Sequence, residues 1–171
     1  ITGCSTGIGY TCAHGLKQRG YRVFATARSE ADLKRLESEG LEAIALDYRF
    51  PESVEACVAE VTKRSGGSLY ALFNNGAYGQ PGAVEDVPRA VLEEQFAANF
   101  FGWHQLTRAV LPMMRKAGEG RIVQCSSVLG ILALKYRGPY NASKFACRGF
   151  TEALRQEMKL AGHPVKVTTV H

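Results

Sequence analysis

Short apolar runs alternate with helix-like stretches along the whole chain, and this alternation constrains the fold more than any other feature. Strand-like runs cover residues 21–27, 41–47, 69–74, 121–126 and 165–170, and helical patterns cover 8–19, 30–38, 51–63, 89–115 and the stretch that Pro139 opens. Strands that alternate with helices form a parallel sheet with helices on its faces. We therefore expect an α/β domain of three layers, with one sheet between two layers of helices.

The two ends of the sequence bear on how this domain is bounded. The chain begins at Ile1 rather than Met and stops at His171, within its last strand-like run. We expect a single domain over residues 1–171 that lacks the start of its first strand and everything after its last strand. Ile1 and Thr2 then end the first strand. The loop that follows them lies at the carboxyl edge of the sheet, where such folds bind ligands.

Composition and charge exclude several classes of protein. The five cysteines are odd in number, widely spaced and without a C-x-x-C pair, so we expect no disulfide framework, no metal site and a reducing, cytoplasmic location. No apolar run approaches the roughly 20 residues of a membrane span, and we expect no membrane segment. The 21 Lys and Arg residues never stand more than two in a row, so we expect no nucleic-acid partner.

Residues 2–9 read TGCSTGIG and fit two different chemistries. The first is the G-x-S-x-G elbow of hydrolases, in which Ser5 is the nucleophile. In the second, Gly3, Gly7 and Gly9 form a loop whose backbone amides approach a phosphate at a helix N-terminus. A hydrolase also needs an acid and a histidine after the serine. His14, His104 and His163 stand at poor positions for that role, and His171, as the final residue, gives no basis for a judgement. The phosphate loop is therefore favoured, and the serine hydrolase remains a remote alternative.

A tyrosine and a lysine lie four residues apart just inside the helix that Pro139 opens, so Tyr140 and Lys144 share one helix face. A free phenol is a poor acid or base at neutral pH, but an adjacent ammonium stabilises its phenolate form. Ser126 and Ser127 end the preceding strand and reach the same sheet edge. Tyr140 can then exchange a proton with a carbonyl or alcohol oxygen that the hydroxyl of Ser127 holds in place.

Taken together, five motifs resemble the short-chain dehydrogenase/reductase family, in its branch with T-G-x-x-x-G-x-G. They are TGCSTGIG, the pair Asn74 and Asn75, Asn99, Ser127 and the YNASK run that starts at Tyr140. The serine stands 13 residues before the tyrosine and Asn99 stands 28 before the serine, as is usual in that family. The resemblance covers the whole chain and implies a Rossmann-type, doubly wound parallel sheet that binds NAD(P).

The resemblance also implies the roles of the catalytic residues. Tyr140 is the general acid and base, and Ser127 positions the reacting oxygen, with Ser126 as a lesser candidate. Lys144 contacts the nicotinamide ribose and stabilises the phenolate. Asn99, a polar residue on the apolar stripe of its helix, holds a water that connects Lys144 to solvent.

The implied cofactor contacts come from loops at the sheet edge. In this family the residue at Asp47 usually contacts the adenine, and the loop at Asn74 and Asn75 lines the adenosine side. One departure is visible, because the family usually reads N-N-A-G and this chain reads N-N-G-A, which moves the flexible residue to Gly76. The complete expected set is Gly3, Ser5, Thr6, Gly7, Ile8, Gly9, Arg28, Asp47, Asn74, Asn75, Gly76, Tyr140 and Lys144.

The end of the second strand indicates which nicotinamide is bound. Dinucleotide folds that take NAD carry an acidic residue here, which binds the adenosine 2′-hydroxyl. This chain has Ala27 at that place, 18 residues after Gly9, and Arg28 follows directly. A carboxylate repels a 2′-phosphate, whereas a guanidinium binds it through charge-assisted hydrogen bonds. We therefore expect NADP(H) in preference to NAD(H).

The expected substrate is a small molecule, namely an aldehyde, ketone or alcohol with hydrophobic bulk. The residues expected near the pocket are largely apolar: Val128, Leu129, Ile131, Leu134 and Tyr136. The family also commonly pairs the long helix, which carries Phe100, Phe101 and Trp103, and the Tyr140 helix with a second subunit. This implies a homodimer or homotetramer.

Two alternative functional hypotheses use the same motifs. A non-catalytic dinucleotide-binding or sensor protein would keep the fold and the cofactor, but it would need only some of the residues Asn99, Ser127, Tyr140 and Lys144. An extended-type sugar-nucleotide epimerase shares Y-x-x-x-K, and the glycine spacing and the short chain disfavour it. The sequence therefore favours an NADP(H)-dependent oxidoreductase that moves a hydride between nicotinamide and a carbonyl or alcohol carbon.

Overall fold

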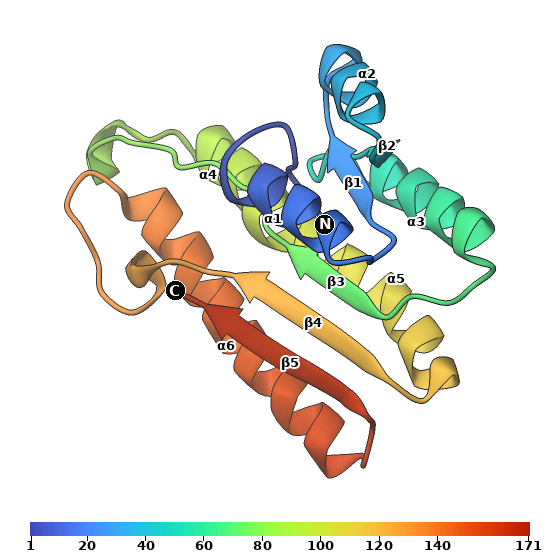
Figure 1. Ribbon diagram of the computed structural model, residues 1–171. Helices are drawn as coiled ribbons and strands as arrows, with labels where there is room; N and C mark the ends of the chain where they lie inside the picture. The colour runs from blue at the N-terminus through green and yellow to red at the C-terminus, as the bar shows by residue number, and fades with distance from the viewer.

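Parallel strands form the centre of the computed structural model, which describes residues 1–171 (Figure 1). The strands are β1 (Phe24–Ala27), β2 (Glu42–Ala45), β3 (Ala71–Asn74), β4 (Gly120–Cys125) and β5 (Val165–Val170). β1 pairs with β2, and β4 lies between β3 and β5, every pair being parallel. The predicted strands are all present, and β5 has the predicted bounds.

The N-terminal residues join these two groups of strands. The amide of Thr2 donates to the carbonyl of Phe73 at 3.0 Å, and the amide of Thr26 donates to the carbonyl of Ile1 at 3.0 Å. The amide of Cys4 donates back to Thr26 at 2.7 Å. Residues 1–4 therefore lie between β1 and β3. The strand order reverses at this point, which is where such sheets bind ligands.

Helices cover both faces of the sheet. On one face, α1 (Gly7–Gln18) and α2 (Glu30–Ser38) pack on β1 and β2. On the other face, α3 (Pro51–Ser65), α5 (Gly102–Ala117) and α6 (Gly138–Leu160) enclose the larger apolar core. Short helical turns lie at Val84–Asp86 and Val128–Gly130. This arrangement confirms the expected three-layer α/β/α fold. None of the helices is both long and apolar enough to cross a membrane.

The expected long helix at 89–115 is not one regular α-helix, so that prediction is wrong in detail. It consists of α4 (Arg89–Phe96), a π-helical segment over Ala97–Phe101 and then α5. π-Turns insert one extra residue into a helix and are frequent at functional sites. Asn99 lies in this segment and is completely buried.

Candidate active site

Gly3 and Gly9 of the glycine-rich loop pack too closely against their neighbours to carry a side chain. Gly3 and Gly7 have left-handed φ values of +66° and +62°, which favour glycine. A Cβ atom at Gly3 would lie 2.6 Å from the Cα of Gly76, and one at Gly9 would lie 2.4 Å from the carbonyl oxygen of Gly3. Thr6 precedes α1 without a side-chain cap. The amides of the first turn therefore remain free for an anionic ligand.

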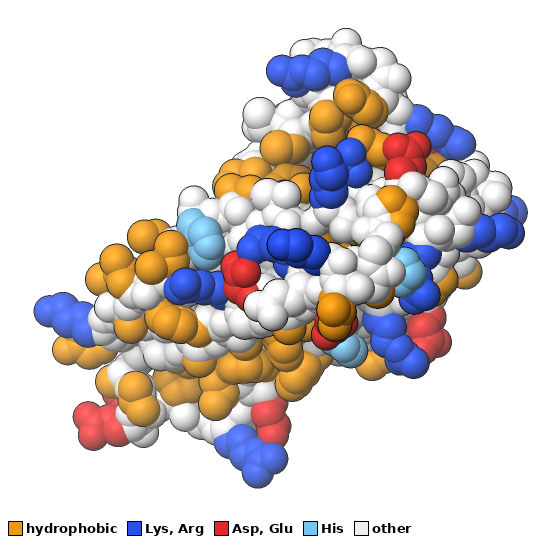
Figure 2. Space-filling model, turned by 90° about the horizontal axis from the view of Figure 1, so that it is seen from below, with side chains coloured by type: hydrophobic (Ala, Val, Ile, Leu, Met, Phe, Trp, Pro, Cys, Tyr) orange, Lys and Arg blue, Asp and Glu red, His pale blue; other side chains and the backbone are white.

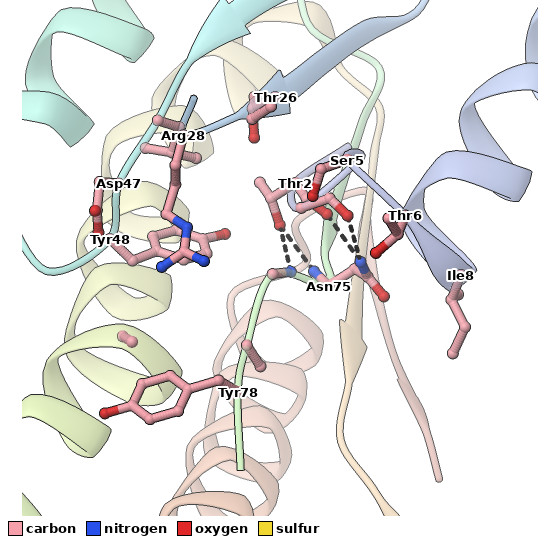
Figure 3. A pocket seen from close by; sticks show the side chains of 16 residues that line it. Thr2, Ser5, Thr6, Ile8, Thr26, Arg28, Asp47, Tyr48, Asn75 and Tyr78 are labelled. Atoms are coloured by element: carbon pink, nitrogen blue, oxygen red, sulfur yellow. Dashed lines mark hydrogen bonds between the residues drawn. The ribbon is translucent and has the colours of Figure 1, made fainter. Parts of the chain in front are cut away.

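A cavity of about 350 Å³ opens beside this loop (Figure 3). It lies at the carboxyl ends of β1, β2 and β3, next to the start of α1. Eight of the residues expected to bind the cofactor line it: Gly3, Ser5, Thr6, Ile8, Arg28, Asp47, Asn75 and Gly76. Thr2, Thr26, Tyr48 and Tyr78 also line the cavity and were not foreseen from the sequence.

Arg28 is the free positive charge of this cavity. It follows the buried Ala27 at the end of β1, and its side chain points into the cavity in Figure 3. The other arginines nearby are engaged, since Arg35 pairs with Asp32 at 2.9 Å and Arg49 pairs with Asp47 at 2.6 Å.

The carboxylate of Asp47 is already paired. Arg49 also contacts Glu94 at 3.0 Å, so one guanidinium links the end of β2 to α4. The hydrogen bond from Arg49 holds the pKa of Asp47 below its usual value. Asp47 therefore lines the cavity as an anion whose charge is largely compensated, and its contact with adenine remains a prediction.

Asn75 ties the loop after β3 to the glycine-rich loop (Figure 3). Its Nδ2 donates to the carbonyls of Thr2 at 3.0 Å and Gly3 at 3.3 Å. In return, the hydroxyl of Thr2 accepts from the amides of Asn75 at 2.8 Å and Gly76 at 3.0 Å. These four bonds hold two walls of the cavity at a fixed separation.

Asn74 is turned into the core instead. Its Oδ1 accepts a hydrogen bond from the hydroxyl of Tyr48, and its Nδ2 donates to Thr107 at 3.0 Å. Both polar ends of the side chain are thus used inside the protein, where Asn74 is fully buried. Asn74 does not line the cavity, and its role as a cofactor contact remains a prediction.

Two buried amides hold the next part of this loop. The Oδ1 of Asn99 accepts from the amide of Tyr78 at 3.1 Å, and its Nδ2 donates to the Tyr78 carbonyl at 2.8 Å. One turn earlier, Gln95 accepts from the amide of Gln80 at 2.8 Å and donates to Tyr78 at 2.9 Å. Gln95 was not among the residues predicted from the sequence. The signal was a second polar side chain four residues before Asn99, on the same helix face.

Lys144 is buried next to Tyr140 at the start of α6, with only 2% of its surface exposed. Its Nζ donates to the carbonyl of Cys125 at the end of β4, at 2.8 Å, and lies 5.6 Å from the ring centroid of Tyr140. Burial lowers the pKa of Lys144 from its usual value of 10.5. The charged or titratable groups that act on it are the thiols of Cys125 and Cys147, with no carboxylate.

The serine pair lies at the same edge of the sheet. The hydroxyl of Ser127 caps the turn after β4 by accepting from the amide of Leu129 at 3.1 Å. A Cβ atom at Gly130 would lie 2.6 Å from the hydroxyl of Ser126 and 2.9 Å from the carbonyl of Lys144. The absence of a side chain at Gly130 therefore lets the end of β4 meet the start of α6.

Ser5 has no histidine partner. His14 pairs with Glu39 at 2.9 Å, and His171 contacts the carbonyl of Ser127 at 3.1 Å. The backbone carbonyl of Ser5 accepts from Arg35 at 2.6 Å. The geometry of a hydrolase elbow is therefore not assembled around Ser5.

An apolar surface borders the site on the side of α6. Figure 2 shows hydrophobic side chains gathered at the end of the molecule where the loop before α6 lies in Figure 1. Tyr136 in this loop has a φ of +60°, the only left-handed value at a residue other than glycine, and Asn141 holds the loop by donating to the carbonyl of Leu134 at 2.8 Å. The exposed apolar residues here are Val128, Ile131, Leu132, Leu134 and Tyr136, while the expected Leu129 is buried.

A sequence model of the family described as short chain dehydrogenase matches residues 1–171. Over 170 residues the chain is 44% identical to the uncharacterized oxidoreductase YbbO of Escherichia coli, covering 99% of this chain and 62% of the relative. It is 38% identical over 165 residues to human retinol dehydrogenase 8, covering 90% of this chain and 51% of that protein. The chain thus spans between one half and two thirds of these relatives.

Solved structures share the fold. A short-chain dehydrogenase from Streptomyces avermitilis superimposes with a TM-score of 0.94 at 34% identity, covering 100% of this chain and 63% of that one. The F189W actinorhodin polyketide ketoreductase with NADPH gives 0.89 at 34% identity, with 99% and 67% covered. A Burkholderia phymatum short-chain dehydrogenase/reductase in complex with NAD gives 0.91 at 28% identity, with 99% and 62% covered.

Proposed function

The chain belongs to the short-chain dehydrogenase family of oxidoreductases, and on this premise we propose that it carries the cofactor-binding and catalytic residues of an NADP(H)-dependent enzyme. That enzyme would interconvert a carbonyl compound and its alcohol. The observation that carries this proposal is the buried Lys144 ammonium, which has no carboxylate partner and lies one helical turn after Tyr140. An ammonium in such a place stabilises the phenolate form of a tyrosine.

The residues at the sheet edge suit a dinucleotide. The close packing of Gly3 against Gly76 and of Gly9 against Gly3 brings backbone amides to the cavity wall, and the free first turn of α1 suits a pyrophosphate. Ser5, Thr6, Gly7 and the exposed Ile8 would hold it there. When bound, the nicotinamide supplies or accepts the hydride. Asp47 and Asn75 would then flank the adenosine, and the buried Asn74 would hold the strand end behind Asn75.

The preference for NADP(H) is supported by Arg28. Its guanidinium faces the cavity without a carboxylate partner, and the neighbouring Ala27 leaves the end of β1 without an acid. Such a site attracts a 2′-phosphate and would offer the 2′-hydroxyl of NAD(H) no acceptor. The related structures hold both kinds of cofactor, NADPH in one and NAD in another, so the family alone does not choose between them.

The chain's own residues divide the work on the substrate. In the proposed reduction, the hydroxyl of Tyr140 gives its proton to the carbonyl oxygen, and in oxidation the phenolate takes that proton back. The hydroxyl of Ser127 donates a hydrogen bond to the same oxygen and fixes its position. Lys144 stabilises the phenolate and would bind the ribose. Asn99 fixes the helix that carries these groups and would support the proton path to solvent.

A hydrophobic carbonyl or alcohol compound is the proposed substrate class. The exposed apolar residues around the loop before α6 border the site and would contact the body of such a molecule. Retinol dehydrogenase 8, one of the relatives, is named for an alcohol, and the polyketide ketoreductase is named for a ketone. Both names agree with this class without naming the substrate of this chain.

Association with a second copy is also proposed, as a homodimer or homotetramer. The face formed by α4, the π-helical segment and α6 exposes Leu92, Phe101 and Phe145, with 56% of Phe101 accessible.

All five cysteines are unpaired, which supports a proposed cytoplasmic location.

Two measurements on the intact protein test the proposed function. Fluorescence titrations with NADPH and NADH give the two affinities, and a panel of aldehydes, ketones and alcohols gives the turnover. We expect tighter binding of NADPH, and turnover that Tyr140→Phe reduces by about a hundredfold or more. Binding without turnover of any panel member would support a sensor protein, while turnover that survives Tyr140→Phe would refute the mechanism.

A further inference from the structure

Trp103 touches both the lysine and the cofactor loop, although no motif pointed to such a role. It is the second residue of α5, directly after the π-helical segment, and is 2% exposed. The Nζ of Lys144 lies 4.5 Å from the centroid of its ring. Its indole N–H donates to the carbonyl of Gly76 at 2.8 Å.

The indole face completes the surroundings of a buried ammonium. Lys144 has three N–H donors, and its hydrogen bond goes to the carbonyl of Cys125. The groups around it are Tyr140 and Cys147 on α6, Cys125 on β4 and Trp103 on α5. Burial raises the pKa of the Cys147 thiol to about 11, so this thiol is neutral at physiological pH. Apart from the Cys125 carbonyl, the ring face of Trp103 is therefore the main group that stabilises the positive charge of Lys144.

The other end of the indole fixes the loop that forms the cavity wall. Gly76 lies between Asn75, which is bonded to the glycine-rich loop, and Ala77, which lines the cavity. The ring of Trp103 also packs against Tyr48 with a centroid distance of 6.4 Å. An indole is rigid between its N–H and its six-membered ring, so the same side chain sets both contacts.

We propose that Trp103 is a positioning residue of this site, which holds the Lys144 ammonium against its ring and ties that position to the cofactor loop at Gly76. The proposal rests on the role of Lys144 in the proposed function. A tryptophan serving only to fill the core would need neither contact, because apolar packing requires matching shape and volume, not a hydrogen bond or a facing cation. A desolvated cation–π contact is worth up to about thirtyfold in an equilibrium.

Two variants of the intact protein separate the two contacts. Trp103→Leu removes both the ring face and the N–H, whereas Trp103→Phe keeps an aromatic face and removes only the N–H. Leu106→Ala is the matched control, since Leu106 is buried one turn further along α5 and belongs to the same core. NMR of ¹³C-labelled lysine follows the titration of Lys144 directly, with Lys144→Met identifying its signal.

In Trp103→Leu we expect the pKa of Lys144 to fall further, because the charged form loses its counterpart. The Tyr140 phenolate is then less stabilised, so the rate of alcohol oxidation should begin to rise at a higher pH than in the parent. The kcat should be about tenfold lower than that of the parent. Trp103→Phe should restore the Lys144 titration and the pH profile but raise the KM for NADPH. Leu106→Ala should lower the melting temperature and leave the titration of Lys144 unchanged.

An unchanged Lys144 titration in Trp103→Leu would overturn the proposal and make Trp103 a packing residue. If Trp103→Leu does not fold, Trp103→Phe decides, because an unchanged KM for NADPH in that variant overturns the link to Gly76. The NMR titration requires no turnover. A changed Lys144 titration in Trp103→Leu, together with a parent protein that shows no turnover, therefore refutes only the proposed reaction. An unchanged Lys144 titration, together with Tyr140-dependent turnover by the parent protein, refutes only the role of Trp103.

Discussion

Asn99 donates a hydrogen bond of 3.2 Å to the hydroxyl of Ser143, the residue directly before Lys144. That hydroxyl donates in turn to the carbonyl of Tyr140 at 2.8 Å. Because the same Asn99 amide also binds the backbone of Tyr78, one buried side chain connects α6 to the loop at the cavity. The π-helical turn brings Asn99 to this junction.

Replacing this amide by an apolar group should loosen both elements. Asn99→Leu keeps a similar volume but leaves the amide of Tyr78 without its partner, and the Tyr78 carbonyl keeps only the bond from Gln95. We expect the free energy of unfolding to fall by about 2 to 4 kcal/mol, with weaker NADPH binding. Urea unfolding and fluorescence titration measure the two effects.

Gln105→Leu is the control for Asn99→Leu, because Gln105 makes one surface hydrogen bond, to Pro51 at 3.1 Å. The free energy of unfolding of Gln105→Leu should differ from that of the parent by no more than about 0.5 kcal/mol. Equal losses in the two variants would show that the Asn99 junction has no special importance.

Two glycines of α1 should respond to alanine in opposite ways. In Gly9→Ala the new Cβ would lie 2.4 Å from the carbonyl of Gly3 and 2.6 Å from Nδ2 of Asn75, so the loop must shift and lose affinity for dinucleotides. In Gly15→Ala the nearest atom is a flexible arginine nitrogen at 3.3 Å, and helix propensity should add up to about 1 kcal/mol. NADPH titrations and thermal unfolding test both variants, and full affinity in Gly9→Ala would contradict the assigned loop.

Arg28 should decide the choice of nicotinamide. Arg28→Gln should weaken NADPH binding by about 10- to 100-fold with little effect on NADH, because a charged hydrogen bond contributes about 1.5 to 3 kcal/mol. Arg28→Asp should reverse the preference by repelling the 2′-phosphate. Lys63→Gln removes the same charge from the exposed surface of α3 and should leave the ratio of the two affinities unchanged. An unchanged ratio in Arg28→Asp would refute this assignment.

Lys144 should cost stability at the pH at which it is needed for activity. The pKa of Lys144 is lowered in the folded protein. Between that pKa and 10.5, the unfolded chain therefore binds more protons than the folded protein. The free energy of unfolding of the parent then increases as the pH rises through this range. Lys144→Met removes the buried charge. This variant should melt no lower than the parent at pH 7, with its relative advantage shrinking toward pH 10, while turnover falls by about a hundredfold or more. A relative advantage that grows with pH would contradict the lowered pKa.

The exposed aromatic face should mediate self-association. Light scattering of the intact protein is expected to give a dimer or tetramer, and Phe101→Asp should shift it toward the monomer because a desolvated carboxylate is unfavourable in an apolar interface. Leu160→Asp is the matched control, since Leu160 is 92% exposed at the far end of α6. A monomeric parent would contradict the proposed association.

Much of the fold could be predicted because its signals are local. The apolar strands, the glycines that end α1 and α2, and the proline that opens α6 specify their elements within a few neighbouring residues. The order of these elements then leaves few arrangements of a parallel sheet. The π-helical turn at Asn99 was not predictable in this way, since its period differs from that of an α-helix by a single inserted residue.

Local sequence patterns were enough to predict the three-layer fold, the glycine-rich loop and the sequence spacing of Ser127, Tyr140 and Lys144, because short-range spacing on strands and helices fixes which edge each residue reaches. Only the folded structure showed that Asp47 is paired with Arg49 and that Asn74 faces the core. It alone placed Trp103 between Lys144 and Gly76. These contacts join side chains from different elements, and their partners are selected by three-dimensional packing, which local periodicity does not encode.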